Sequence, residues 1–182
     1  MADELPIPDY DPTTLIRSAT VEIDAPAGVV WEVLTDLDRY PEWNPFCVSA
    51  RSTLEIGAPV EMTLADYSGG AGTFPYTEFV CAVVPERLLS WELRPTEFSS
   101  DAARRDQVIE PIGNERCQYY STDAFLGDEA HRIMAESGEW VRRAFDDTAA
   151  AVKNRSEALY AQRQGAGSVG LATSSANANS KG

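Results

Sequence analysis

The segment 19–46, ATVEIDAPAGVVWEVLTDLDRYPEWNPF, predicts a strand, a helix and an aromatic turn in direct succession. Residues 18–24 alternate between apolar and polar side chains, which is the period of a half-buried strand. Pro26 has a position typical of the first helical turn, and apolar residues follow it at helical spacing. The helix is expected to break at Tyr40–Pro41, and residues 43–45, Trp-Asn-Pro, are expected to form a rigid turn.

The chain beyond this segment predicts successive antiparallel strands and then one long helix. Residues 129–163 carry an apolar stripe at helical spacing and predict that helix. A single amphipathic helix covers only one face of a sheet, so we expect a curved seven-stranded antiparallel sheet to wrap around it. This α+β arrangement leaves a cavity between sheet and helix, which is a natural ligand site. After the first strand, the expected strands are 47–56, 59–67, 75–84, 87–94, 103–112 and 116–126.

The two ends of the chain differ in composition from its middle. Residues 1–16 include Pro6, Pro8 and Pro12, and we expect them to form an extended arm rather than a helix. Residues 165–182 are mostly Gly, Ala, Ser and Asn, and this composition predicts a disordered tail. The ligand-binding domain is therefore expected to span residues 17–164.

Charge and residue counts exclude several classes of function. The 182-residue chain has 15 Lys and Arg residues against 29 Asp and Glu residues, and its net charge of −14 argues against nucleic-acid partners. His131 is the single histidine, which excludes a histidine-rich metal site and the Rieske ligands of an oxygenase domain. Cys47, Cys81 and Cys117 form no C-x-x-C pair. We expect no metal and no cofactor.

Signals for membranes and secretion are weak. No segment approaches the roughly 18 apolar residues that a spanning helix needs. Residues 1–12 lack the basic and apolar regions of a signal peptide. We expect a soluble cytoplasmic protein without membrane insertion, and the sequence leaves a homodimer open.

Several short stretches resemble the START/SRPBCC superfamily, the helix-grip fold of birch-pollen allergens and polyketide cyclases. The resemblance covers about 18–160 and implies the fold predicted above. It says little about function, because members include lipid carriers, hormone receptors, aromatase/cyclases and chaperone activators. The stretches are ATVEIDAP at 19–26, VWEVLTD at 30–36, YPEWNPF at 40–46, PERLLSW at 85–91, IEPIG at 109–113 and FLG at 125–127.

Strand alternation identifies the side chains that face the expected cavity. In relatives the strand that corresponds to 103–112 ends near Pro111, which would turn Ile109 inward. Together with the strand 116–126, five polar side chains then share the inner face: Arg105, Gln107, Tyr119, Ser121 and Asp123. A buried polar group costs a few kcal/mol unless it is paired, so a purely structural face would favour apolar residues. Two interpretations remain open. In the first, the register is shifted by one residue or Arg105 and Asp123 merely neutralise each other. In the second, the polar cluster binds a ligand.

The second interpretation gives these side chains chemical roles. Arg105 and Tyr119 would stabilise a developing enolate or phenolate, while Asp123 would move a proton. His131 is near the start of the long helix, close to the cavity mouth in relatives, and is a further candidate acid or base. The alternative for His131 is a solvated surface residue. The predicted catalytic residues are thus Arg105, Tyr119, Asp123 and His131, without any metal ligand.

Ligand contacts are expected from the aromatic turn, the inner strand faces, the rim of the loop 68–72 and the long helix. Each has a structural alternative, as a hydrophobic plug, a core residue or part of a plain hairpin. The predicted ligand-binding residues are Trp43, Asn44, Met62, Tyr67, Phe74, Tyr76, Trp91, Gln107, Ser121, Met134 and Trp140.

The sequence therefore predicts a protein that binds a hydrophobic, aromatic or polyketide-like small molecule. The leading hypothesis is a cofactor-independent cyclase, dehydratase or isomerase that resembles polyketide cyclases. The competing hypothesis is a non-catalytic carrier or sensor of lipid-like ligands with the same cavity. A chaperone-partner module is a third class, but the sequence shows no exposed apolar stripe that favours it.

Overall fold

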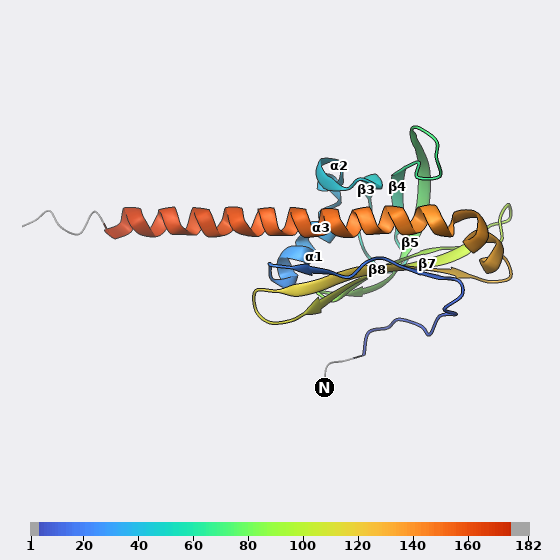
Figure 1. Cartoon of the computed structure of the whole chain (residues 1–182), viewed down its shortest axis with the longest axis horizontal. Helices are drawn as coiled ribbons and strands as arrows, with labels where there is room; N and C mark the ends of the chain where they lie inside the picture. Colours follow the sequence, from blue (N-terminus) through green and yellow to red (C-terminus); the bar gives the residue numbers. More distant parts are fainter. Residues whose placement is uncertain (1–3, 176–182) are drawn as a thin grey trace, which may run out of the picture.

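The computed structural model describes residues 4–175, with side chains as far as residue 166. Its elements are α helices, one short 3-10 helix and strands of a single sheet (Figure 1). In chain order they are β1 (Leu15–Arg17), β2 (Val21–Ile23), α1 (Ala27–Thr35), η1 (Leu37–Arg39), α2 (Tyr40–Trp43), β3 (Cys47–Arg51), β4 (Pro59–Ala65), β5 (Thr73–Val84), β6 (Leu88–Leu93), β7 (Ala102–Pro111), β8 (Cys117–Leu126) and α3 (Ala130–Ser175).

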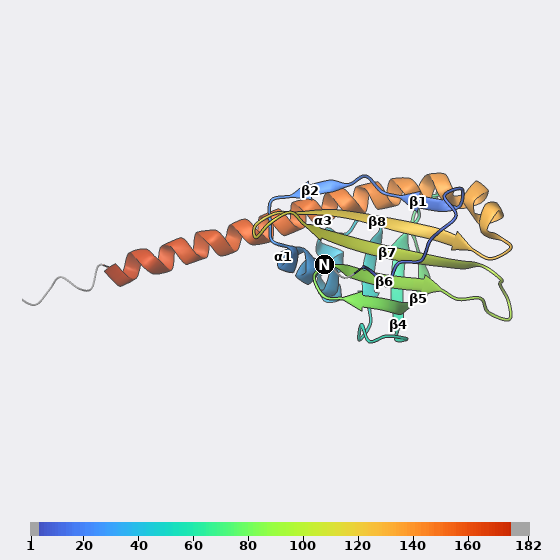
Figure 2. The ribbon, with the colours of Figure 1, turned by 90° about the horizontal axis from the view of Figure 1, so that it is seen from below.

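The strands form one antiparallel sheet that lies against α3. The strand order is β1-β8-β7-β6-β5-β4-β3, and β2 also pairs with β8. Figures 1 and 2 show α3 along one face of this sheet, with α1 beside it. The predicted α+β helix-grip architecture is confirmed.

The first strand differs from the single strand expected at 18–24. The structure has two short strands, β1 and β2, so the sheet has eight strands rather than seven. The interruption lies at Ser18, whose Oγ accepts a hydrogen bond from the Ser121 backbone N–H at 3.0 Å. The Ser18 N–H donates to the Ser121 carbonyl at 2.9 Å. A side-chain oxygen thus takes over one rung of the β-ladder and divides the strand.

Two helical turns lie between α1 and the segment 43–45 that was expected to form a rigid turn, so the chain does not leave helical structure at Tyr40–Pro41. α1 ends at Thr35, one helical turn before the expected break, and η1 and α2 follow it. Pro41 lies in the first turn of α2, where its missing N–H costs nothing. α2 buries Tyr40, whose hydroxyl donates to the Leu34 carbonyl at 2.8 Å. Asn44 then ends the turn, and its Oδ1 accepts hydrogen bonds from two following backbone N–H groups.

The N-terminal arm is docked on the outer face of the sheet, opposite α3 (Figure 1). Asp106 of β7 is fully buried there and accepts hydrogen bonds from Tyr10 Oη at 2.6 Å and Ser90 Oγ at 2.5 Å. Arg104 joins Asp106 at 3.0 Å and the Pro6 carbonyl at 2.7 Å. The arm therefore shields a buried carboxylate that plays no part in the inner cavity.

The last helix continues beyond the expected end at residue 163. α3 reaches Ser175, and it projects past the edge of the sheet (Figure 1). Residues 165–175 contain no proline, and a helix that is already nucleated gains one backbone hydrogen bond per added residue. The first part of the tail that was expected to be disordered is thus helical, while 176–182 lie outside the described residues. Within 4–175, no helix is long and apolar enough to cross a membrane.

Candidate functional site

Two adjoining cavities lie between the concave face of the sheet and α3. The larger has a volume of about 200 Å³ and the smaller about 20 Å³. Phe46, Arg105 and Phe145 line both cavities, so these three side chains form the partition between them. The smaller cavity has room for about one water molecule or one ligand oxygen.

The larger cavity is an aromatic chamber with one polar end. Its aliphatic lining comes from β4, β6, β7 and α3, and Asp101 and Ser137 add polar groups. Glu78, Arg105 and Asp123 supply the buried charges on the sheet side. The aromatic lining residues are Phe46, Phe74, Tyr76, Phe125, Trp140 and Phe145.

The register of β7 and β8 brings the polar side chains together. Arg105 lies directly opposite Asp123, and Gln107 lies opposite Ser121. Directly opposed residues in an antiparallel pair have Cβ atoms about 4.5–5.5 Å apart, so these side chains share one small volume. The alternation predicted for these two strands is confirmed, and the one-residue slip is excluded.

Arg105 also reaches across β6 to a second carboxylate. Its Nη2 lies 3.3 Å from Oε1 of Glu78 on β5, and the side chains of the two residues are 9% and 3% exposed. Aromatic rings hold the guanidinium in place, with its Cζ 4.9 Å from the Phe145 centroid and 5.7 Å from that of Phe46. Such cation–π contacts gain strength when the cation is desolvated. Arg105 is thus fixed by both charge and packing.

Burial gives the carboxyl groups of the site unusual proton affinity. Burial raises the pKa of Asp123 to about 7, although the nearby Arg105 lowers it. The pKa of Glu78 is also raised by burial, and again Arg105 opposes the shift. A carboxyl group with a pKa near neutrality exchanges its proton readily at physiological pH, which is what a general acid or base requires.

Several buried polar atoms of the site have no hydrogen-bond partner among the described residues. Two are carboxylate acceptors in the larger cavity, Glu78 Oε2 and Asp123 Oδ1. Trp91 Nε1, Gln107 Nε2 and the Tyr119 hydroxyl border the smaller cavity, and Arg105 Nε belongs to the side chain that lines both cavities. The unpartnered carboxylate acceptors therefore lie in the larger cavity, and most of the unpartnered donors lie toward the smaller one. A ligand that enters the chamber meets polar groups whose hydrogen-bonding capacity is still free.

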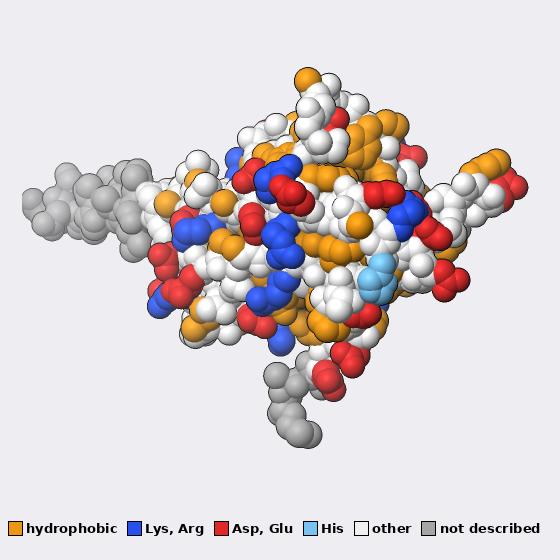
Figure 3. Space-filling view, turned by 45° about the vertical axis from the view of Figure 1, so that its right-hand side comes forward, with side chains coloured by type: hydrophobic (Ala, Val, Ile, Leu, Met, Phe, Trp, Pro, Cys, Tyr) orange, Lys and Arg blue, Asp and Glu red, His pale blue; other side chains and the backbone are white. Residues whose placement is uncertain are grey.

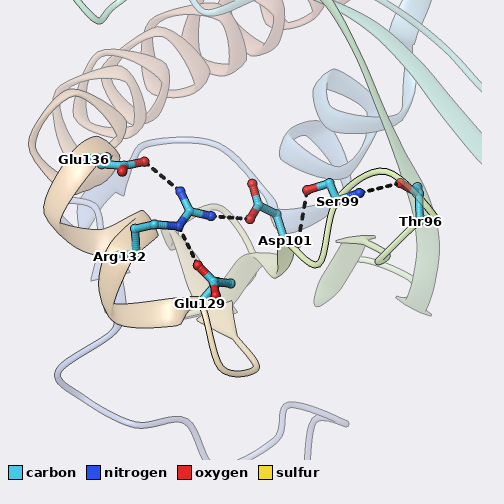
Figure 4. A network of polar contacts seen from close by, with 6 residues as sticks. All are labelled: Thr96, Ser99, Asp101, Glu129, Arg132 and Glu136. Atoms are coloured by element: carbon cyan, nitrogen blue, oxygen red, sulfur yellow. Dashed lines mark hydrogen bonds and ion pairs between the residues drawn. The ribbon is translucent and has the colours of Figure 1, made fainter.

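An ion-pair network links the cavity lining to the start of α3 (Figure 4). Arg132 Nη2 lies 2.5 Å from Oδ1 of Asp101, which lines the larger cavity. Its other nitrogens bind Glu129 at 2.5 Å and Glu136 at 2.7 Å. The Asp101 N–H donates to Ser99 Oγ at 3.2 Å, so the network continues into the β6–β7 loop. The half-exposed Arg132 thus balances the charge of Asp101.

The structure brings most of the predicted site residues to these two cavities. Arg105 lines both cavities, and the predicted catalytic residues Tyr119 and Asp123 line the smaller and the larger, respectively. Of the predicted ligand contacts, seven line one cavity or the other: Asn44, Phe74, Tyr76, Trp91, Gln107, Ser121 and Trp140.

His131 lies away from both cavities. Its side chain is exposed, and Nε2 lies 3.2 Å from Oγ1 of Thr13 in the N-terminal arm. Figure 3 shows the single histidine, in pale blue, at the surface. The first turn of α3 directs Ile133 toward the cavity, so His131 two residues earlier faces elsewhere. The expected position at the cavity mouth is not what the structure shows.

Four other predicted contacts also lie outside the two cavities. Trp43 lines a surface groove beside α1 and α3, because the helical turn of α2 directs Tyr40 inward instead. Met62 is buried in the hydrophobic core, and the partly buried Met134 packs against that core. The Tyr67 hydroxyl donates to Asp147 of α3 at 3.0 Å, so this residue joins the rim to the helix.

Glu78 is the important residue that sequence reasoning missed. It follows Phe74 and Tyr76 in the alternation of β5 and precedes Val80, which is fully buried. A glutamate at an inward position of a strand whose neighbours on that face are apolar is an unusual buried charge. This pattern was visible in the sequence, whereas the pairing with Arg105 across β6 required the three-dimensional arrangement.

Burial keeps the three cysteine thiols neutral. Burial raises the pKa of Cys47 to about 12, and it raises the pKa of both Cys81 and Cys117 to about 11. Neutral thiols are weak nucleophiles. In the part of the chain that the structure describes, no group of three or more His, Cys, Asp or Glu side chains is arranged to hold a metal ion.

A curved antiparallel sheet around one long helix, with a polar-ended aromatic cavity between them, defines a START-like helix-grip protein. The family model described as polyketide cyclase/dehydrase and lipid transport matches residues 16–157. The chain belongs to this family. A search of curated proteins gives no significant match.

Solved structures with the same fold come from bacteria and plants. A protein of Nitrosomonas europaea superimposes with a TM-score of 0.60 at 18% identity, covering 86% of this chain and 99% of that chain. The Zhui aromatase/cyclase of Streptomyces sp. R1128 gives 0.54 at 22% identity, with 79% and 93% covered. Norcoclaurine synthase of Thalictrum flavum, a point mutant in complex with a transition-state analogue, gives 0.53 at 16% identity, with 78% and 92% covered. Likeness at these identities establishes the fold.

Proposed function

We infer that the protein binds a small aromatic molecule in the larger cavity and catalyses a cofactor-independent proton transfer on it. The reaction class is that of a cyclase, dehydratase or isomerase. One observation carries this proposal: the Arg105–Asp123 pair lies at the polar end of an aromatic chamber, with the pKa of Asp123 raised by burial to about 7. A base poised near neutrality beside a fixed cation is the arrangement that enolate chemistry requires.

The chemistry can be written with these two side chains. The Asp123 carboxylate removes a proton from a carbon next to a ligand carbonyl, and the electron pair moves onto the carbonyl oxygen. The Arg105 guanidinium stabilises the resulting enolate. Protonated Asp123 then returns the proton, either to another carbon, which completes an isomerisation, or to a departing hydroxyl group, which leaves as water. His131 has no role in this scheme, since it lies outside the cavities.

Carriage of an apolar ligand without turnover is the second candidate. The aromatic lining of the larger cavity favours it, because such a surface binds apolar molecules without any chemistry. The family description itself spans cyclases, dehydrases and lipid transport. A volume of about 200 Å³ suits a ligand of one or two rings better than a long acyl chain.

Deuterium exchange of a small aromatic ketone separates these candidates. Phenylacetone is incubated with the full chain in D₂O, and loss of its benzylic CH₂ signal is followed by proton NMR. We expect exchange to be faster than in buffer alone, with saturation as the ketone concentration rises. Binding of the ketone without faster exchange would support the carrier. A ketone that neither binds nor exchanges would contradict both candidates.

A further inference from the structure

The larger cavity contains more carboxyl groups than it contains cations to balance them. Glu78, Asp101 and Asp123 all line it, whereas Arg105 is the single basic residue among its lining side chains. Arg132 compensates Asp101 from outside at 2.5 Å. Within the chamber, one guanidinium therefore faces two buried carboxyl groups. The chamber has no positive charge in excess when both are ionised.

The hydrogen-bonding atoms of the chamber that lack a partner also favour a ligand that donates hydrogen bonds. Arg105 directs Nη2 to Oε1 of Glu78, at 3.3 Å. Oε2 of that glutamate and Oδ1 of Asp123 are buried and have no partner among the described residues. Within residues 4–166, Arg105 Nε is a third buried atom without a partner, so unpartnered acceptors outnumber unpartnered donors two to one in the lining. An added carboxylate would bring further acceptors and a like charge next to carboxyl groups that are already buried.

The aromatic walls act in the same direction as the carboxyl groups. Phe74, Tyr76 and Trp140 line the chamber, and the faces of such rings are negative in their quadrupole. Cations are attracted to these faces, and anions are not. The net charge of −14 on the whole chain adds a long-range field of the same sign. The carboxyl groups, the aromatic rings and the net charge of the chain therefore all favour a cationic ligand over an anionic one.

We propose that the larger cavity selects its ligand by charge, admitting an aromatic molecule that carries a hydrogen-bond donor, a protonated amine or a hydroxyl group, in addition to its reacting carbonyl, and excluding the matching carboxylate. This inference rests on the proposed function, because it assigns a substrate class to the same cavity. It names Glu78 and Asp123 as the residues that determine the selection. When both are ionised, Arg105 balances one of the two negative charges and leaves no excess positive charge to attract an anionic ligand. Proton transfer to Asp123 removes one of these charges, which frees Arg105 to stabilise the enolate.

A matched set of single-ring probes tests the selection. The probes are 2-phenylethylamine, 2-phenylethanol, phenylacetate and ethylbenzene, titrated into the full chain at pH 8 and followed by protein NMR shifts. We expect the amine and the alcohol to bind about tenfold or more tightly than phenylacetate, since like-charge contacts in a desolvated site are costly. Ethylbenzene reports apolar binding alone.

Two variants and one control assign the effect to residues. Glu78→Gln and Asp123→Asn each remove one carboxylate with little change in shape, and each is expected to reduce the penalty against phenylacetate. Glu61→Gln is the matched control, because Glu61 is exposed on the outer side of β4, one residue from the pairing partner of Glu78. It should leave the ratio of affinities unchanged.

Acidification of the unmodified protein gives an independent measurement if a variant fails to fold. Asp123 is faced by Arg105 and Glu78 and lies near Asp106 on the other side of the sheet, and its pKa of about 7 is well above that of phenylacetate. Between pH 8 and pH 5.5, Asp123 gains a proton while phenylacetate remains an anion and the amine a cation. The ratio of affinities is expected to shift toward phenylacetate by about threefold or more.

The outcomes distinguish the inference from the function on which it rests. Tightest binding of phenylacetate, or equal binding of all charged and neutral probes, would overturn charge selection while the aromatic cavity stands. An unchanged ratio in both carboxylate variants, or on acidification, would also overturn it. If no probe binds, ethylbenzene included, the proposed function itself fails.

Discussion

Arg105→Met is expected to lower the free energy of unfolding by about 3–5 kcal/mol at pH 7, the range typical of breaking a buried ion pair from one side. Methionine keeps much of the apolar contact with Phe145 and Phe46, so the loss is mainly electrostatic. Glu78 and Asp123 would remain buried without a cation. Urea unfolding followed by circular dichroism measures the effect.

Two further variants separate charge from packing. Adding Glu78→Gln to Arg105→Met is expected to restore more than half of the lost stability, because one uncompensated carboxylate disappears. Arg143→Met is the surface control; its side chain is 52% exposed, and such ion pairs contribute only about 0–1 kcal/mol. If Arg105→Met and Arg143→Met lowered the free energy of unfolding equally, the buried charge cluster of Glu78, Arg105 and Asp123 would be contradicted.

Asp123→Asn is expected to slow deuterium exchange of bound phenylacetone by about 100-fold or more, the usual contribution of a general base. Asparagine keeps the size of the side chain but takes up no proton at neutral pH. Glu61→Gln, on the outer side of the sheet, should leave the exchange rate unchanged. Full exchange activity in Asp123→Asn would assign the base to another residue.

The same variant should also change how stability depends on pH. Burial raises the pKa of Asp123 from 3.8 to about 7 in the folded protein, so the folded state favours the protonated form. Its contribution to stability is complete below about pH 4 and is lost as the pH rises through 7. Asparagine does not ionise, so Asp123→Asn does not lose stability as the pH rises. We expect this variant to be more stable than the unmodified protein at pH 8, by on the order of 1–3 kcal/mol. At pH 5 the difference should be small or reversed.

The architecture followed from local periodicity, and its exceptions have local causes. Alternating strands and a long apolar stripe predict a sheet wrapped on a helix, as found. The division of the first strand could not be predicted, since it depends on Ser18 Oγ meeting the Ser121 N–H across two strands distant in sequence. The placement of Tyr40 rather than Trp43 at the inner surface likewise depends on the helical turn α2, which begins where the helix was expected to break.

The site was predictable along strands and much less so between them. Alternation, with its phase set by Pro111 as in relatives, placed Arg105 on the same inner face as Asp123, because both belong to regular strands. The third charge, Glu78, lies two strands away, and its contact with Arg105 depends on side-chain reach across β6. The position of His131 depends on how the first turn of α3 meets the N-terminal arm, which no short-range pattern specifies.

Intermolecular NOEs from phenylacetone to isotope-labelled protein test the ligand site most directly. If the sheet–helix cavity holds the ligand, the ketone protons show NOEs to Trp140, Val141 and Phe145, which line the larger cavity. The groove beside α1 is the competing location, and it is lined by Val33, Trp43 and Leu159. NOEs to these groove residues, with none to the cavity residues, would contradict the assignment of the functional site.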